Sequence, residues 1–207
     1  MAAISLTICN LALGDLRAPP IADVGEQSIE ASLCTRYYPH ALARMLDDYT
    51  WQFTKRVATL AALVTNERAS EWSYAYGLPD DLSQAIRLVP SGAYVSYSDW
   101  GSVYAPLTIP SRWLDFVVEN GALYTNVQDA VLEYAIGSCD ESVMPPLFRE
   151  ALRRMLAADL AVPLTNQSSL VGPLRQLAEA AREDAIANDM NRQPNHDRVD
   201  DVAWVRR

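Results

Sequence analysis

Apolar residues recur at helical spacing in two segments near the start of the chain. The first segment contains Ile4, Ile8 and Leu11 and predicts a short helix, for which Gly14 is a natural C-cap. Ser28 can cap a second, longer helix that contains Pro39, so we expect a kink or a break at this proline. The apolar positions of the second helix are Ile29, Leu33, Tyr37, Leu42 and Met45.

The pattern changes from helical to alternating after this second helix. Trp51 and Phe53 alternate with polar residues, which predicts a short strand that buries both rings. Alternation begins again at Trp72, and Glu119-Asn120-Gly121 supplies a hairpin turn further along. Other expected strands cover residues 85–89, 93–97, 113–118, 122–125 and 131–136. These strands predict a small, strongly twisted antiparallel sheet or an open barrel.

Helical periodicity returns in the last third of the chain. Pro145-Pro146 is a typical helix start, and the helix that follows should end near Pro163. A final helix is expected from about residue 167 to residue 189, and its regular part starts at Pro173 if Gly172-Pro173 breaks its first turn. After Asn191 the periodicity is lost.

Together these patterns predict an α+β protein. A helical bundle carries an inserted antiparallel β-rich extension and ends in an extended C-terminal tail. We assign residues 1–71 and 140–190 to the bundle, residues 72–139 to the insertion and residues 191–207 to the C-terminal arm. The 207 residues suffice for one domain with such an insertion.

Composition and charge narrow the class of function. Half of the residues are hydrophobic, but no apolar run approaches the ~18 residues of a membrane span, so we expect no membrane partner. The first residues lack the basic region of a secretory signal. The net charge is −9, and no dense cluster of Lys and Arg is present to grip DNA phosphates. An acidic surface is ordinary for solubility, and it would also suit the wall of a channel through which DNA passes.

Few residues are candidates for catalysis or metal binding. Adjacent acids point in different directions from a helix or strand, so they rarely converge on one bond. The only histidines are His40 and His196, and no glycine-rich phosphate loop is present. The three cysteines, Cys9, Cys34 and Cys139, are far apart in the sequence and predict buried reduced thiols. We therefore expect no enzyme activity, no catalytic residue, no cofactor and no metal. The paired acids are Asp47-Asp48, Asp80-Asp81, Asp140-Glu141 and Asp200-Asp201.

Aromatic residues are concentrated between Trp72 and Tyr134. Base stacking normally requires Arg or Lys nearby, and Arg87 is the only basic residue from Tyr74 through Pro110. Packing in the core and at interfaces explains these residues better, with a carbohydrate platform as the alternative. The expected interface residues are Tyr94, Tyr97, Trp100 and Tyr104 in the loop of residues 91–110, and Trp204, Arg206 and Arg207 in the terminal segment, which we expect to become ordered on docking.

Three short motifs occur in order in the first part of the chain. They are Ile8-Cys-Asn-Leu-Ala-Leu-Gly14, then Trp51-Gln-Phe53, then Tyr74-Ala-Tyr-Gly-Leu-Pro-Asp-Asp81. In this combination the chain resembles the tail tubular protein A family, the head–tail adaptor or gatekeeper proteins of short-tailed phages. The motifs match the family's opening helix, its Trp-x-Phe strand and its Tyr-x-Leu-Pro-x-Asp signature. Pro39 and the long segment of residues 91–110 depart from the family pattern.

The resemblance implies a virion structural protein. Members of the family form a dodecameric ring below the portal, so the implied partners are other copies of the chain, the portal protein, and the tail nozzle or tail tube protein. Genome DNA would pass through the lumen of the ring without specific binding. The implied location is the virion tail, with the host cytoplasm as the site of assembly.

Two other classes of function remain open from the residues alone. One is a tail-associated hydrolase of the cell wall, against which the absence of convergent acids or of a histidine-based dyad argues. The other is a soluble protein-binding module.

Overall fold

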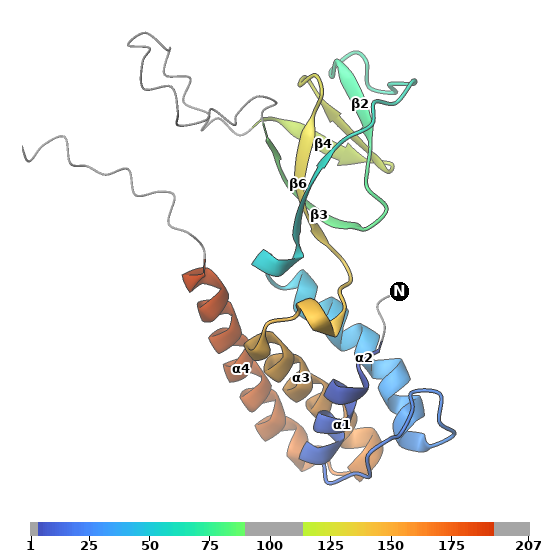
Figure 1. Ribbon diagram of the computed structural model, residues 1–207, viewed down its shortest axis with the longest axis vertical. Helices are drawn as coiled ribbons and strands as arrows, with labels where there is room; N and C mark the ends of the chain where they lie inside the picture. The colour runs from blue at the N-terminus through green and yellow to red at the C-terminus, as the bar shows by residue number, and fades with distance from the viewer. Residues whose placement is uncertain (1–3, 90–113, 193–207) are drawn as a thin grey trace, which may run out of the picture. The chain divides into compact units, whose positions relative to one another are not determined.

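The computed structural model describes residues 4–89 and 114–192 and shows an α+β protein (Figure 1). These residues form four α-helices and two small antiparallel sheets, which confirms the predicted fold class. The chain divides into two compact units. The helical unit contains the described residues up to Phe53 and from Ser138 onward, and the β unit contains those from Thr54 to Gly137. The sequence placed the start of the β-rich region at residue 72, whereas the β unit begins at Thr54.

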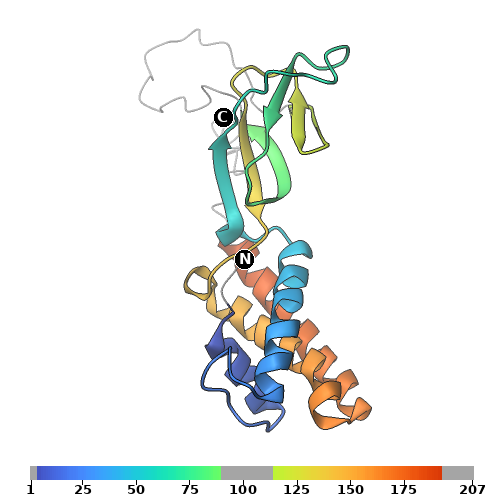
Figure 2. The same cartoon turned by 90° about the vertical axis from the view of Figure 1, so that its right-hand side faces the viewer.

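In the helical unit, α3 packs against each of the other three helices. It runs antiparallel to both α2 and α4, so α2 and α4 run in the same direction (Figures 1 and 2). Within the described ranges, no helix is long and apolar enough to cross a membrane. The bounds are Leu6–Asp15 for α1, Ile29–Asp47 for α2, Pro146–Thr165 for α3 and Val171–Asn191 for α4.

The end of α1 differs from the prediction. Gly14 lies inside the helix, and the left-handed residue is Arg17, with φ of 56°. The Arg17 N–H donates to the carbonyl of Gly14 at 3.1 Å, and the Ala18 N–H donates to the carbonyl of Leu13 at 3.0 Å. This pair of bonds is a Schellman motif, which satisfies the last carbonyls of the helix. The prediction of Gly14 as the C-cap is therefore wrong.

Pro39 does not break α2, which continues through it from Ile29 to Asp47. Because proline has no N–H, the carbonyl of Thr35 loses its usual helical donor. Tyr38, Ala41 and Leu42, which surround the proline, are buried, and this packing offsets the lost bond. Of the expected kink or break at this position, the break is therefore wrong.

α3 ends slightly later in the sequence than predicted. α3 continues through Pro163 to Thr165 and ends at Asn166, whose φ is 53° and whose N–H donates to the carbonyl of Val162 at 2.9 Å. Asparagine tolerates this left-handed conformation. After a 3₁₀ turn, α4 begins at Val171, so Gly172-Pro173 does not break its first turn. A proline fits there because the N–H groups of the first turn have no helical partner.

Six strands form the two sheets of the β unit within the described residues. One sheet has the order β1-β6-β3 and the other the order β2-β5-β4, and all pairs are antiparallel. β6 is therefore the central strand of the first sheet, and β5 that of the second. The bounds are Lys55–Thr59 for β1, Tyr74–Gly77 for β2, Leu82–Val89 for β3, Phe116–Glu119 for β4, Ala122–Thr125 for β5 and Val131–Ile136 for β6.

The strands expected over residues 122–125 and 131–136 are confirmed as β5 and β6. Asn120 and Gly121 form the turn between β4 and β5 and have positive φ values of 51° and 76°. Two positive φ values are what a type I′ hairpin turn requires, so the predicted hairpin is confirmed. The strand expected over residues 93–97 lies outside the described residues.

The segment of Trp51 and Phe53 is not a strand. Gln52–Thr54 forms a single 3₁₀ turn, and β1 begins only at Lys55. The backbone N–H of Gln52 donates to the Asp189 carboxylate at 3.0 Å instead of to a neighbouring strand. The predicted strand at this position is therefore wrong, although Trp51 is buried as expected.

Candidate functional site

The first of the three motifs contains Asn10, which fixes the loop between α1 and α2. Its side-chain amide donates to the carbonyl of Ile21 at 2.9 Å, and its side-chain carbonyl accepts the Ile21 N–H at 2.8 Å. Ile21 is itself buried. The Asn10 side chain thus satisfies both backbone hydrogen-bonding groups of Ile21, as a neighbouring backbone would do. This role is structural.

Trp51, from the second motif, is the centre of an aromatic cluster in the helical unit. It is 1% exposed, and its Nε1–H donates to the carbonyl of Met45 at 2.7 Å. Its ring centroid is 4.8 Å from that of Phe148 and 5.0 Å from that of Tyr49, both in edge-to-face geometry. Phe53 packs on Phe148 at 5.0 Å. The cluster fixes the end of α2 against the first turn of α3.

The third motif forms β2 and the turn that follows it. The Tyr76 hydroxyl donates to the carbonyl of Val127 at 2.9 Å. The Leu82 N–H donates to the carbonyl of Pro79 at 3.1 Å and closes a tight turn before β3. Asp81 accepts the hydroxyl of Tyr134, on β6, at 2.9 Å. The acid of this motif is therefore a contact within the β unit.

Asp189 is a structural residue that the sequence did not reveal. It lies near the end of α4, is 4% exposed, and accepts the N–H of Gln52. Burial and the Asp189 carboxylate together raise the pKa of Tyr49. Asp189 occurs in a stretch rich in alanine and acids, where it looks like a solvated residue. The available signal is its spacing from Ala178 and Ala185, which places all three on one face of α4.

Within the described ranges, three of the paired acids, Asp48, Asp81 and Glu141, contact basic or hydroxyl groups. Asp48 lies 3.8 Å from Arg182. Glu141 accepts the hydroxyl of Ser5 and lies 3.6 Å from Arg149. Such contacts occupy the carboxylates in structural roles. The other members are Asp47, Asp80 and Asp140, which are exposed, and Asp200 and Asp201, which lie outside the described residues.

The three cysteines are free and buried. Burial raises the pKa of Cys139 to about 11, and the contact with Cys34 together with burial raises the pKa of Cys9. The nucleophilic thiolate form of both residues is therefore disfavoured. His40 is exposed on α2. In the part of the chain that the structure describes, no group of three or more His, Cys, Asp and Glu side chains is placed to hold a metal ion.

The free energy of unfolding should fall as the pH rises above 9, in part because of Cys139. The pKa of its thiol rises from an ordinary 9.0 to about 11 in the folded protein. The folded state thus binds the proton more tightly, so this contribution is complete below pH 9 and is lost as the pH rises through about 11.

Urea unfolding at a series of pH values measures this effect, with Cys139→Ala as the test variant. The variant should lose part of the decline between pH 9 and about 11. Burial raises the pKa of Tyr38 from 10.0 to about 12, so a decline from pH 10 to about 12 should remain in both proteins. Equal slopes between pH 9 and about 11 in the variant and its parent would rule out the contribution of Cys139.

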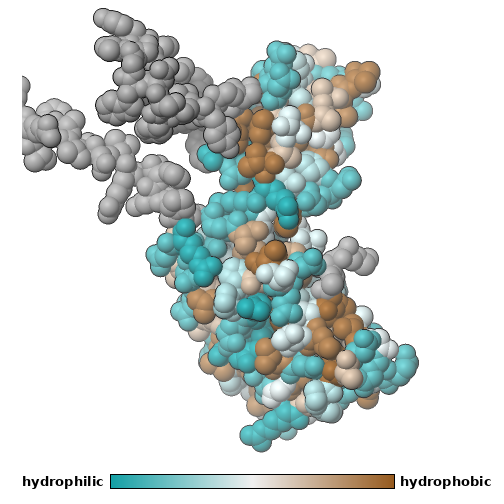
Figure 3. All heavy atoms as spheres, in the orientation of Figure 1, coloured by the Kyte–Doolittle hydropathy of each residue, from teal (hydrophilic) through white to brown (hydrophobic). Residues whose placement is uncertain are grey.

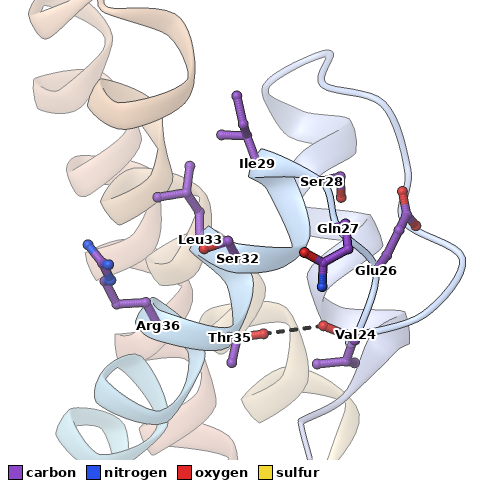
Figure 4. A pocket seen from close by; sticks show the side chains of 10 residues that line it. Val24, Glu26, Gln27, Ser28, Ile29, Ser32, Leu33, Thr35 and Arg36 are labelled. Carbon is purple, nitrogen blue, oxygen red and sulfur yellow. Dashed lines mark hydrogen bonds between the residues drawn. The ribbon is translucent and has the colours of Figure 1, made fainter.

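A hollow of about 530 Å³ lies at the start of α2 (Figure 4). The loop before α2 and the first turns of α2 line it, with Val24, Ile29, Leu33 and Arg36 among the lining residues. The Thr35 hydroxyl and the Val24 carbonyl, 3.4 Å apart, hold the loop against the helix. The mixed apolar and charged wall of the hollow suits contact with another surface.

All of the interface residues expected from the sequence lie outside the described residues. They are Tyr94, Tyr97, Trp100, Tyr104, Trp204, Arg206 and Arg207. Their role in an interface stays a prediction.

The sequence matches no protein-family model, and no curated protein matches it significantly. Function is therefore inferred from the residues and from their geometry.

Proposed function

We propose that this chain is the head–tail adaptor of a short-tailed phage. Copies of it form a ring that joins the portal protein to the tail nozzle or tail tube protein, and genome DNA passes through the lumen without specific binding. The protein is then a virion component of the tail below the portal, assembled in the host cytoplasm. It acts through interfaces, without catalysis, a cofactor or a membrane.

The observation that supports this proposal most strongly is the role of the three motifs. Asn10 fixes the loop after α1, Trp51 holds the junction of α2 and α3, and Asp81 holds the turn before β3. Residues that mark a structural family are expected at such positions, because they determine where the chain turns. In an enzyme, the characteristic residues would instead meet in a site.

The charge of the molecule is consistent with a DNA channel. Acidic residues outnumber basic residues in the described part of both units, so the surplus is not confined to one segment. A wall with this charge repels phosphates and lets a duplex slide without sticking. DNA-gripping proteins show the opposite balance.

The proposal includes a finer architecture. The helical unit is the bundle that forms the body of the ring, and the β unit is an extension from it. The segment of residues 191–207 is an arm that docks on a neighbouring component. Residues 91–110 contact the next tail component or a neighbouring subunit.

Electron microscopy of the purified protein, alone and mixed with the portal of the same phage, tests the proposal. We expect closed rings, or portals that carry a ring on one end. A protein that stays monomeric in both samples and that releases fragments from peptidoglycan would instead support the tail-associated hydrolase. A monomer without either property would favour a protein-binding module.

A further inference from the structure

Two helices of the helical unit, α2 and α4, carry exposed residues of complementary chemistry. Both pack on α3, and Asp48 and Arg182, 3.8 Å apart, lie between them. Because successive residues of a helix are spread around its axis at 3.6 per turn, each helix also has residues that face away from this contact. These outward residues define two surfaces, described in turn below.

The α2 surface consists of Ile29, Leu33 and Arg36, on the wall of the hollow at the start of this helix (Figure 4). Ile29 is 71% exposed, although it is a large aliphatic residue. Arg36 is exposed and makes no salt bridge to another described residue. Ile29 and Arg36 are two turns apart and therefore project on the same side of α2. In the view of Figure 3, hydrophobic side chains gather toward the α1 and α2 side of this unit.

The α4 surface consists of Leu177, Ala180 and Asp184. Leu177 is 50% exposed, and Asp184 is exposed and makes no salt bridge within the described residues. The spacing from Leu177 to Asp184 is two turns, as it is from Ile29 to Arg36. Arg182, which faces Asp48, lies on a different side of α4 from these residues.

The two surfaces match in order, spacing and charge. On each helix an aliphatic residue is followed two turns later by a charged one, about 10 Å along the axis. The charges are opposite, positive at Arg36 and negative at Asp184. Because α2 and α4 run in the same direction, rotation about an axis along the helices places α4 of one copy parallel to α2 of the next. Leu177 then meets Ile29, and Asp184 meets Arg36.

We propose that the α4 surface of one copy binds the α2 surface of a second copy of this chain. The contact is heterologous, because the two surfaces differ, so each copy offers one of each kind and the assembly can extend or close into a ring. The inference rests on the proposed ring but identifies a particular interface within it. Leu177 fills the hollow beside Ile29, and the pair of Arg36 and Asp184 sets the register.

Cysteine cross-linking tests the contact directly. A chain with both Ile29→Cys and Leu177→Cys should give a ladder of covalent oligomers under mild oxidation by diamide, at protein concentrations up to the solubility limit. A mixture of the two single variants should give dimers only, because each copy then has a single reactive surface. The native cysteines are buried, so the parent chain oxidised in the same way measures the background of cross-linking. Leu11→Cys combined with Leu177→Cys is the matched control, since Leu11 is 49% exposed but lies on α1, and it should give no ladder.

Charge reversal gives a second, non-covalent readout. Arg36→Glu or Asp184→Arg alone should weaken self-association roughly tenfold in sedimentation, because each variant opposes like charges. An equal mixture of the two variants should recover association, because every contact in an alternating assembly then joins opposite charges. No recovery, or a ladder no stronger than that of the Leu11 control, would overturn this interface. Rings without a ladder would leave the adaptor function standing, whereas a ladder without closed rings would support the interface and count against the ring.

Discussion

Trp51→Ala should lower the free energy of unfolding of the helical unit by about 3–5 kcal/mol. Trp51 is 1% exposed and touches Phe148 and Tyr49, so truncation leaves a cavity in an aromatic cluster. The change also removes the donor to the carbonyl of Met45 near the end of α2. Urea denaturation followed by the far-UV helical signal measures the loss.

The matched control is Trp72→Ala, in the β unit. Trp72 is only partly buried, and its Nε1 has no hydrogen-bond partner in the described residues. This variant should therefore lose less stability and leave the helical signal intact. If Trp51→Ala keeps the parental melting temperature and only loses assembly, Trp51 is an interface residue and the structural role assigned to it is wrong.

Leu132→Ala should destabilise the β unit by about 2–5 kcal/mol and leave the helical unit folded. Leu132 is fully buried in β6, the central strand of its sheet, and pairs with Ala58 on one side and Leu88 on the other. Hydrogen exchange followed by mass spectrometry resolves the two units. Peptides from β1, β3 and β6 should exchange faster, and peptides from α2 and α3 should not change.

Leu156→Ala is the reciprocal control, because Leu156 is fully buried in α3. It should speed exchange in the helices and spare the strands. Faster exchange throughout the chain in both variants would show a single cooperative unit instead of two.

The sequence predicts the α+β class and the central strands well, because these depend on local patterns. The β4–β5 hairpin follows from Asn120 and Gly121, which adopt positive φ at low cost. β5 is buried throughout, and the first half of β6 alternates between half-buried and buried residues. Both patterns are typical of strands in the interior of a sheet.

Helix ends were harder to predict, because tertiary contacts decide them. α2 continues through Pro39, where the burial of Tyr38, Ala41 and Leu42 offsets the lost hydrogen bond, and α3 continues through Pro163. Arg17, rather than Gly14, adopts the left-handed conformation after α1, and the Asn10 side chain fixes the loop that follows. A local sequence pattern does not predict the bonds between Asn10 and Ile21, which are 11 residues apart.

The turn that follows α2 depends on a contact between residues far apart in the sequence. The alternation around Trp51 predicts a strand. The backbone turns at Gln52 instead, because the Gln52 N–H donates to the carboxylate of Asp189, far along the chain. β1 was missed for a related reason. It is an edge strand in which Lys55 is half-buried and both Arg56 and Val57 are exposed, so it lacks a clear apolar alternation.

The hollow at the start of α2 could not be found from the sequence either. Ile29 has the helical spacing of a core residue, yet it is 71% exposed. Its exposure depends on where the loop before α2 returns, which Asn10 and Thr35 fix through bonds to Ile21 and Val24. The sequence placed the interfaces in the aromatic loop and in the tail instead.

Native mass spectrometry of the purified protein, with and without the portal, tests the adaptor proposal most directly. The account predicts a closed assembly of a fixed number of 22.9 kDa chains, either free or on the portal, and twelve chains if the family resemblance extends to stoichiometry. Addition of the portal should shift all of this assembly into one larger complex. A mass of a single 22.9 kDa chain at every concentration, unchanged by the portal, would contradict the account.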